Sequence, residues 1–326
     1  MKNERIVVTG SAGFIGSHTV ARLLGQGACV LGIDNYDAFY ARAIKERNEA
    51  ANRAAAGGEP GRYTFIEVDI AEPDAFAIAV ESFRPTGIIH LAAKAGVRPS
   101  IDDPPGYVRA NVVAVSEVLE AAHRLGCSRV VVASSSSVYG DTSPVPLSED
   151  GPAVDPISPY AATKRAAELL ATTHHHLTGQ PISCLRFFTV FGPRQRPDLA
   201  IAKFMRRIDD GEPITMFGNG DTSRDYTYID DIVSGIVAAY ERTPAFGFRV
   251  WNLGSDRPTR LDDLIALIGE VVGKAPVIEH ADRQPGDVKQ TWADLTRSTS
   301  ELGYEPKTPL RVGLEQQWAA ARENAG

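Results

Sequence analysis

A glycine-rich junction near the N-terminus constrains the fold more than any other stretch of the chain. A strand expected over residues 5–8, apolar from Ile6 on, leads into Gly10, Gly13 and Gly16, and a helix is expected to follow to about residue 26. Glycine lets the backbone turn tightly and come close to a pyrophosphate at the positive end of a helix. The pattern therefore predicts a strand, a turn and a helix that begin a nucleotide-binding unit, the alternative being a glycine-rich turn without a ligand.

A second apolar strand, expected over residues 29–33, ends in Asp34. The number of residues between the glycines and Asp34 is about that expected when an acid hydrogen-bonds the adenosine ribose of a dinucleotide. A carboxylate at this position repels a ribose phosphate, so the sequence favours NAD over NADP.

Strands and helices then alternate as far as residue 188, which predicts an α/β protein with a Rossmann-like, doubly wound parallel sheet. A helix is expected over residues 37–56 and a long one over 107–124. Beyond Thr189 the regular alternation of strands and helices ends, and only short strands with interspersed helices are expected. We therefore expect an NAD-binding domain over 1–188, to which residues of about 229–255 return, and a smaller C-terminal α/β substrate domain over most of 189–326.

A serine-rich strand end and a tyrosine–lysine pair supply candidate chemistry. Ser134 to Ser137 follow the apolar run 130–133, so they are expected at the carboxyl end of a buried strand, where open α/β sheets bind ligands. Tyr160 and Lys164 are four residues apart and share one helical face. A neighbouring ammonium group favours the phenolate and lowers a tyrosine pKa from its usual value near ~10. Together with a serine hydroxyl, the pair predicts proton transfer at an alcohol or a carbonyl.

Composition excludes several classes of protein. The net charge of −7 argues against a nucleic-acid or anionic-membrane surface, and no apolar run is long enough for a bilayer span. The three cysteines are far apart, which predicts free thiols and, with no room for a signal peptide, a cytoplasmic protein. The side chains of His174 to His176 would point in different directions on a helix and could not all bind one metal ion. We therefore interpret the run as structural and predict no metal site.

The glycine spacing and three further segments of the chain resemble motifs of a known family. The glycine spacing resembles the short-chain dehydrogenase/reductase family. The segments 95–98 (AGVR), 186–193 (RFFTVFGP) and 223–231 (SRDYTYIDD) resemble the UDP-glucuronate 4-epimerases within its extended branch. The resemblance covers nearly the whole chain.

The resemblance implies a role for each matching residue. Tyr160 would be the acid–base group, Lys164 would bind the nicotinamide ribose and Ser135 would hydrogen-bond the reacting oxygen. The NAD site would comprise Gly10, Gly13, Phe14, Ile15, Gly16, Asp34, Asn35, Asp69, Ile70, Leu91, Ala92, Ala93 and Lys94, with Tyr160 and Lys164. The UDP-sugar would contact Arg98, Ser136, Ser137, Thr189, Arg196, Arg224, Arg283 and Asp287. Arg283 stands one place before the family's basic position, which Gln284 occupies.

The implied activity is the reversible 4-epimerisation of UDP-glucuronate to UDP-galacturonate through a 4-keto sugar, with NAD retained and a homodimer formed by helices near 107–124 and 160–177. A sugar 4,6-dehydratase is disfavoured because Ser136 and Ser137 replace its Asp-Glu pair. Thr189 stands where UDP-glucose 4-epimerases commonly have Asn. A UDP-glucuronate decarboxylase is the nearest enzymatic alternative. A non-catalytic NAD-binding regulatory protein is the other class, and such proteins usually lack the tyrosine or the lysine.

Overall fold

A seven-stranded parallel sheet forms the centre of the protein. The structure, a computed structural model, describes residues 1–2, 4–282 and 288–323. The sheet has the order β10-β6-β5-β4-β1-β2-β3. Its strands are β1 (Arg5–Thr9), β2 (Cys29–Asp34), β3 (Tyr63–Glu67), β4 (Gly87–His90), β5 (Val130–Ser135), β6 (Ile182–Phe187) and β10 (Phe248–Leu253). The order reverses between β1 and β4, which opens a crevice at the carboxyl ends of the strands. The predicted doubly wound fold is confirmed.

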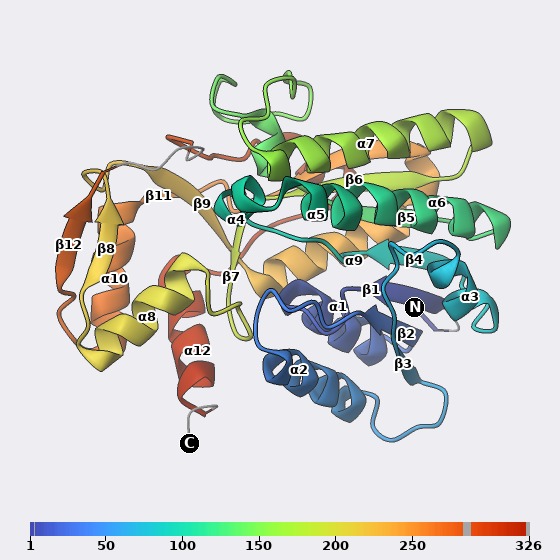
Figure 1. Cartoon of the computed structure of the whole chain (residues 1–326), viewed down its shortest axis with the longest axis horizontal. Helices are drawn as coiled ribbons and strands as arrows, with labels where there is room; N and C mark the ends of the chain where they lie inside the picture. The colour runs from blue at the N-terminus through green and yellow to red at the C-terminus, as the bar shows by residue number, and fades with distance from the viewer. Residues whose placement is uncertain (3, 283–287, 324–326) are drawn as a thin grey trace.

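Helices cover both faces of this sheet, as Figure 1 shows for α6 and α7 above it and α1 and α2 below. One core packs the sheet against α1 (Phe14–Gly25) and α9 (Ile229–Phe246), with α2 (Arg42–Ala55) outside α1. The second core packs the opposite face against α3 (Ala75–Glu81), α6 (Ala114–Arg124) and α7 (Pro159–Thr178). Successive strand residues alternate between these two cores, as the pleat requires.

The remaining elements gather at the carboxyl edge of the sheet, on the left of Figure 1. A three-stranded sheet joins β7 (Thr189–Phe191), β9 (Ser223–Tyr228) and β11 (Pro258–Arg260), and a two-stranded one joins β8 (Ile214–Phe217) to β12 (Ile278–Ala281). The helices there are α8 (Ala200–Asp210), α10 (Leu261–Val272) and α12 (Leu310–Glu323), whereas α11 (Thr296–Leu302) packs against α9 and β10. Meanwhile α9 and β10 pack on the central sheet, so the chain returns to it after β9.

Two helices differ from the sequence-based expectation. The helix expected from residue 37 begins only at Arg42, because side chains of Asn35 and Asp37 accept backbone N–H bonds two residues on and hold a turn instead. The helix expected over 107–124 is divided into α5 (Pro104–Val108), a π-helical turn η1 (Arg109–Val113) and α6. Asn111 lies in that turn.

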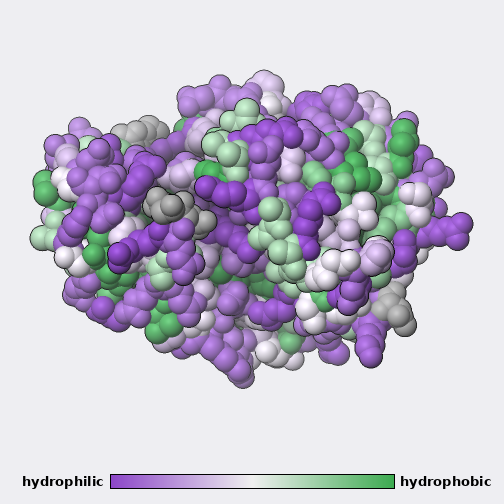
Figure 2. Space-filling view, turned by 90° about the horizontal axis from the view of Figure 1, so that it is seen from below, coloured by the Kyte–Doolittle hydropathy of each residue, from purple (hydrophilic) through white to green (hydrophobic). Residues whose placement is uncertain are grey.

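One face of the molecular surface is mainly polar (Figure 2). The face seen from below in Figure 2 is mainly hydrophilic, and its hydrophobic residues form small scattered groups. Among the described residues, no helix is both long enough and apolar enough to cross a bilayer. The thiols of Cys29, Cys127 and Cys184 are unpaired.

Candidate active site

A cavity of about 770 Å³ lies at the carboxyl edge of the central sheet and collects most of the predicted site residues. Its size is within the usual range of ligand sites. The predicted residues that line it are Gly10, Gly13, Phe14, Ile15, Gly16, Asp34, Asn35, Asp69, Ile70, Leu91, Ala92, Ala93, Lys94, Arg98, Ser135, Ser136, Tyr160, Lys164, Thr189, Arg196 and Arg224. Arg283 and Asp287 lie outside the described residues.

The glycine turn brings the start of α1 against the cavity. Gly10 has φ +68°, and a Cβ atom there would lie 2.8 Å from the backbone nitrogen of Ala92. A Cβ atom on Gly16 would lie 2.0 Å from the carbonyl oxygen of Gly10. No side chain caps the N-terminus of α1, which leaves its first N–H groups without side-chain acceptors, and its first residues line the cavity. This arrangement fits the pyrophosphate of a dinucleotide.

Asp34 lies at the tip of β2, where backbone N–H groups of Tyr36 and Ala12 donate to its two oxygens at 2.9 and 3.2 Å. Lys45 on α2 places its Nζ atom 3.9 Å from Asp34 Oδ1 and also lines the cavity. Burial raises the pKa of Asp34, and the charge of Lys45 opposes that rise. Lys45 was not predictable from the sequence, because only the folded position of α2 brings it to the carboxylate.

The adenine side of the predicted site is held by an ion pair. Asp69 Oδ2 accepts from Arg109 Nη1 at 2.7 Å, and Asp69 Oδ1 accepts from the backbone N–H of Ala71 at 3.0 Å. Nearby, the amide of Asn111 accepts from the Lys94 N–H at 2.8 Å and donates to the Lys94 carbonyl at 2.9 Å. The π-helical turn thus fixes the loop that follows β4.

Tyr160 and Lys164 meet the serine strand at the cavity, both at the start of α7. Ser158 caps this helix by accepting the Ala161 N–H at 3.1 Å. Lys164 Nζ donates to the carbonyl of Ala133 at 2.8 Å. Ser135 Oγ accepts from the backbone N–H and the hydroxyl of Ser137 at 3.2 and 3.0 Å. The ring of Tyr160 packs edge-on against that of Tyr107, with 6.2 Å between centroids.

The expected low pKa of Tyr160 is wrong for the protein alone. Burial raises the pKa of Tyr160, and the Ser135 hydroxyl and the Arg196 guanidinium lower it only partly. Burial also lowers the pKa of Lys164 to about 8. The ammonium group is bonded to the Ala133 carbonyl and does not offset the cost of a buried phenolate.

The predicted sugar-binding residues approach the cavity from several elements. Ser136 and Thr189 line it, whereas Ser137, turned towards Ser135, is not among its described lining residues. Within the described part of the chain, the Thr189 hydroxyl has no hydrogen-bond partner. The contact of Ser137 with a substrate stays a prediction.

Three arginines reach the cavity. The Arg98 guanidinium stacks on Phe217 of β8, 4.4 Å from the ring centroid, and Phe217 was not predicted as a site residue because only folding brings β8 beside the cavity. Arg196 pairs with Asp198 at 2.7 Å and stacks on Phe39 at 4.7 Å. Arg224 donates to the carbonyl of Ser223 at 2.9 Å.

The histidine run lies away from this cavity. His174 Nε2 is 3.2 Å from Gln180 Oε1, and His175 Nδ1 is 2.7 Å from the Gln180 carbonyl oxygen. No group of side chains suited to a metal ion occurs within residues 1–2, 4–282 and 288–323.

Comparison with known proteins decides the family. Residues 6–254 match the model of the NAD dependent epimerase/dehydratase family. The chain belongs to this family. Among the relatives of this family member, the UDP-glucuronate 4-epimerase of Thermodesulfobacterium geofontis is 38% identical over 98% of this chain and 96% of its own length. The predicted resemblance is therefore confirmed.

Solved structures of similar proteins match this epimerase/dehydratase family member over nearly its full length. A UDP-glucuronic acid 4-epimerase from Bacillus cereus, in complex with UDP-glucuronic acid and NAD, is 35% identical with a TM-score of 0.90, and the match covers 99% of this chain and all of that one. The UDP-glucose 4-epimerase of Thermotoga maritima, with UDP-glucose, is 30% identical with a TM-score of 0.86 over 98% of this chain and 99% of its own.

Proposed function

We propose that the protein is an NAD-dependent UDP-glucuronate 4-epimerase, an isomerase of nucleotide sugars. One observation carries the proposal: Tyr160, Lys164 and Ser135 meet at a single cavity in a chain similar along 99% of its length to an epimerase solved with UDP-glucuronic acid and NAD. The glycine turn, the start of α1 and Asp34 fit a dinucleotide in that cavity. NAD, when bound there, supplies a reversible hydride acceptor for C4 of the sugar.

The protein's own groups then handle protons and orientation. Tyr160 takes the proton of the 4-hydroxyl and returns it after the 4-keto sugar has presented its other face. Ser135 hydrogen-bonds the reacting oxygen and, with Arg196, lowers the pKa of Tyr160 in part, and protonated Lys164 would hold a ribose hydroxyl of NAD. Inversion at C4 results, with no net oxidation. Arg224 offers planar donors to the diphosphate and Arg196 to the nucleotide end of the substrate, and Arg283 and Asp287 remain predicted nucleotide contacts.

The carboxylate of the substrate separates this proposal from the alternatives. We expect turnover of UDP-glucuronate and little turnover of UDP-glucose under the same conditions. Equal rates on both sugars would favour a UDP-glucose 4-epimerase, and a pentose product would favour a decarboxylase. Absence of turnover with NAD bound would favour a regulatory protein.

We also propose that residues 1–188, with about 229–255, hold NAD and that most of 189–326 holds the UDP-sugar. The free thiols support a cytoplasmic location. These proposals leave the identity of the sugar unaffected.

The cofactor prediction concerns Asp34. The carboxylate should accept ribose hydroxyls and repel a ribose phosphate, even with Lys45 beside it. Protein purified without added nucleotide and then denatured is expected to release mainly NAD, identified by mass spectrometry. Release of mainly NADP would contradict the role of Asp34.

The second prediction concerns control of the 4-keto intermediate. Oxidation at C4 makes a β-keto acid, which loses carbon dioxide unless the bond from C5 to the carboxylate is held poorly aligned with the carbonyl. We propose that Thr189, Ser136 and Ser137 donate to this carboxylate and that the loop 96–98 closes over it, with Arg98 its positive partner. Thr189→Ala is expected to slow epimerisation several-fold and to raise the share of UDP-pentose, whereas Thr189→Ser should resemble the wild type.

Arg98→Ala is likewise expected to slow epimerisation and to raise the share of UDP-pentose. The products of both variants are quantified by liquid chromatography and mass spectrometry. An unchanged product ratio in both Thr189→Ala and Arg98→Ala would show that neither residue restrains the carboxylate.

The third prediction is a homodimer through η1, α6 and α7. Helices α6 and α7 contact each other, and Leu169 and Leu177 on α7 are 52% and 76% exposed. Apolar side chains exposed on one helix pair are typical of an interface. Light scattering is expected to give a dimer, and Leu169→Glu a monomer, while Ile78→Glu on α3 should stay dimeric. A wild-type monomer at micromolar concentration would refute the interface.

A further inference from the structure

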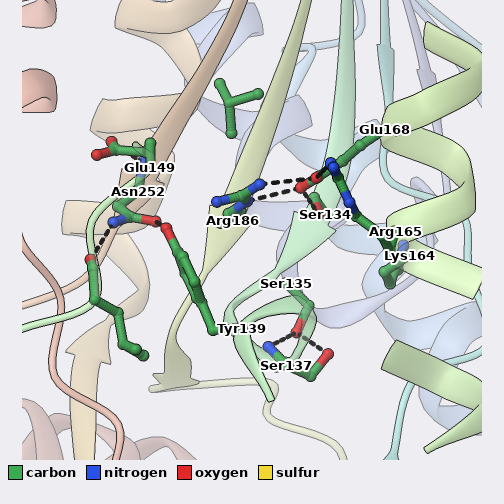
Figure 3. Close-up of polar contacts among 12 residues, drawn as sticks. Ser134, Ser135, Ser137, Tyr139, Glu149, Lys164, Arg165, Glu168, Arg186 and Asn252 are labelled. Carbon is green, nitrogen blue, oxygen red and sulfur yellow. Dashed lines mark hydrogen bonds and ion pairs between the residues drawn. The ribbon is translucent and has the colours of Figure 1, made fainter. Parts of the chain in front are cut away.

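A buried carboxylate lies directly behind the serine strand. Glu168 is one helical turn after Lys164 on α7 and is 1% exposed. Its Oε1 accepts from Ser134 Oγ at 2.6 Å and from Arg186 Nε at 2.8 Å. Its Oε2 accepts from Arg186 Nη2 and Arg165 Nη1, each at 2.9 Å. Figure 3 shows Arg186 and Ser134 converging on this one group from β6 and β5.

The ion pair of Glu168 and Arg186 has further contacts on the Arg186 side. The Arg186 guanidinium lies over the ring of Tyr139, 4.6 Å from its centroid, and Arg186 Nη1 has no hydrogen-bond partner among the described residues. The aromatic face therefore stabilises the part of the cation that no acceptor reaches. Tyr139 in turn donates its hydroxyl to Asn252 Oδ1 at 2.8 Å, which connects the ion pair to β10. Hydrogen bonds to the carboxylate and an aromatic ring beside the guanidinium together lower the cost of burying this ion pair.

Two side chains of α7 thus bind two successive residues of β5. Lys164 Nζ binds the Ala133 carbonyl at 2.8 Å, and Glu168 binds the Ser134 hydroxyl at 2.6 Å. Side chains alternate along a strand, so fixing Ser134 on the helix side fixes Ser135 on the opposite side. Ser135 lines the cavity in that orientation.

We propose that Glu168, bound by Arg186 and Ser134, is a positioning residue of the proton-transfer site, which sets the orientation of Ser135 and Lys164 relative to Tyr160. The inference rests on the proposed role of these three groups in epimerisation. Glu168 does not line the cavity and has no contact with substrate in this scheme. Its effect passes through Ser134 to the strand and along one helical turn to Lys164.

The charge of Glu168 also bears on Lys164. The titratable groups that act on the ammonium are Glu168 on α7, Cys184 on β6 and His90 on β4. Burial lowers the pKa of Lys164 to about 8, whereas Cys184 and Glu168 both raise it. Loss of the Glu168 charge therefore lowers this pKa further, so the protonated lysine is lost at a lower pH as pH rises.

Two matched pairs of variants test the proposal. Ser134→Ala removes the hydroxyl that reaches Glu168 at 2.6 Å, on a residue that also lines the cavity. Ser183→Ala removes the hydroxyl of a buried strand serine that bonds Thr243 Oγ1 at 2.8 Å instead. Glu168→Gln removes the charge behind the site. Glu301→Gln removes a comparable carboxylate that accepts from Arg249 Nε at 2.8 Å and Trp251 Nε1 at 2.7 Å, away from the cavity.

Steady-state kinetics, bound NAD content and thermal melting are measured on all four holoproteins. We expect kcat to fall about 10-fold in Ser134→Ala and on the order of 100-fold in Glu168→Gln, with KM within about twofold and NAD retained. The alkaline limb of the kcat profile should move to lower pH in Glu168→Gln only. Both controls should keep wild-type kcat and pH profile, even where their melting temperatures fall.

Unchanged kcat and pH profile in Ser134→Ala and Glu168→Gln would overturn the proposal and leave Glu168 a purely structural ion pair. If Glu168→Gln does not fold, the kcat of Ser134→Ala against Ser183→Ala decides alone. Kinetics use whichever of UDP-glucuronate and UDP-glucose the wild type converts. A wrong sugar assignment therefore appears in the wild type, whereas failure of the positioning role appears only in the variants.

Discussion

Replacement of Tyr160 by phenylalanine is expected to lower kcat by about 100- to 10,000-fold, the usual contribution of acid–base catalysis. The variant loses only the hydroxyl, while its ring keeps the edge-on contact with Tyr107. Lys164 and Ser135 keep their bonds to the strand and to Ser137. The fold and the content of bound NAD should therefore remain those of the wild type.

The control for Tyr160→Phe is a second loss of a phenol hydroxyl. Tyr228 bonds Gln316 of α12 outside the cavity, so Tyr228→Phe should leave kcat near the wild-type value. Turnover is measured with UDP-glucuronate at saturation, alongside circular dichroism. Near-normal kcat in Tyr160→Phe would show that another group transfers the proton.

Replacement of Lys164 by methionine should lower kcat by an effect of similar order and also reduce the amount of NAD retained. The methionine is similar in length, but it removes the ammonium that binds the Ala133 carbonyl and is expected to hold the nicotinamide ribose. Burial lowers the pKa of Lys164 to about 8, so its protonated form decreases as pH rises through that value. Retention of NAD by the wild type should fall over the same range, and this pH dependence should be missing in Lys164→Met.

Lys274→Met is a suitable comparison for Lys164→Met, because Lys274 pairs with Asp209 at the surface, 2.9 Å away. It should match the wild type in both kcat and NAD content. If Lys164→Met retained full NAD and only kcat fell, the lysine would act on Tyr160 alone and the ribose contact would be wrong.

The parts of the site that were predictable from the sequence depend on local patterns. The glycines of the first turn, Asp34 at a strand end and the Tyr160–Lys164 spacing each need only a few consecutive residues and the rule that parallel strands end at one edge. The structure brings all of them to the cavity.

The parts that were not predictable depend on packing across the chain. Lys45 reaches Asp34 from another element, and Phe217 meets Arg98 only once β8 has folded beside the cavity. The spacing of Tyr160 and Lys164 suggested a lowered tyrosine pKa, yet burial raises that pKa, and burial cannot be read from spacing. The ion pair of Glu168 and Arg186 joins residues from α7 and β6 that show no shared motif.

Product analysis by NMR tests the central claim most directly. Purified protein, without added NAD, is incubated with UDP-glucuronate, and the configuration at C4 of the sugar is followed by the proton couplings of its ring. The account predicts conversion to UDP-galacturonate up to an equilibrium mixture, with almost no pentose, and the same mixture when the reaction starts from UDP-galacturonate. A UDP-pentose as the main product, or no change at C4 in protein that carries NAD, would contradict it.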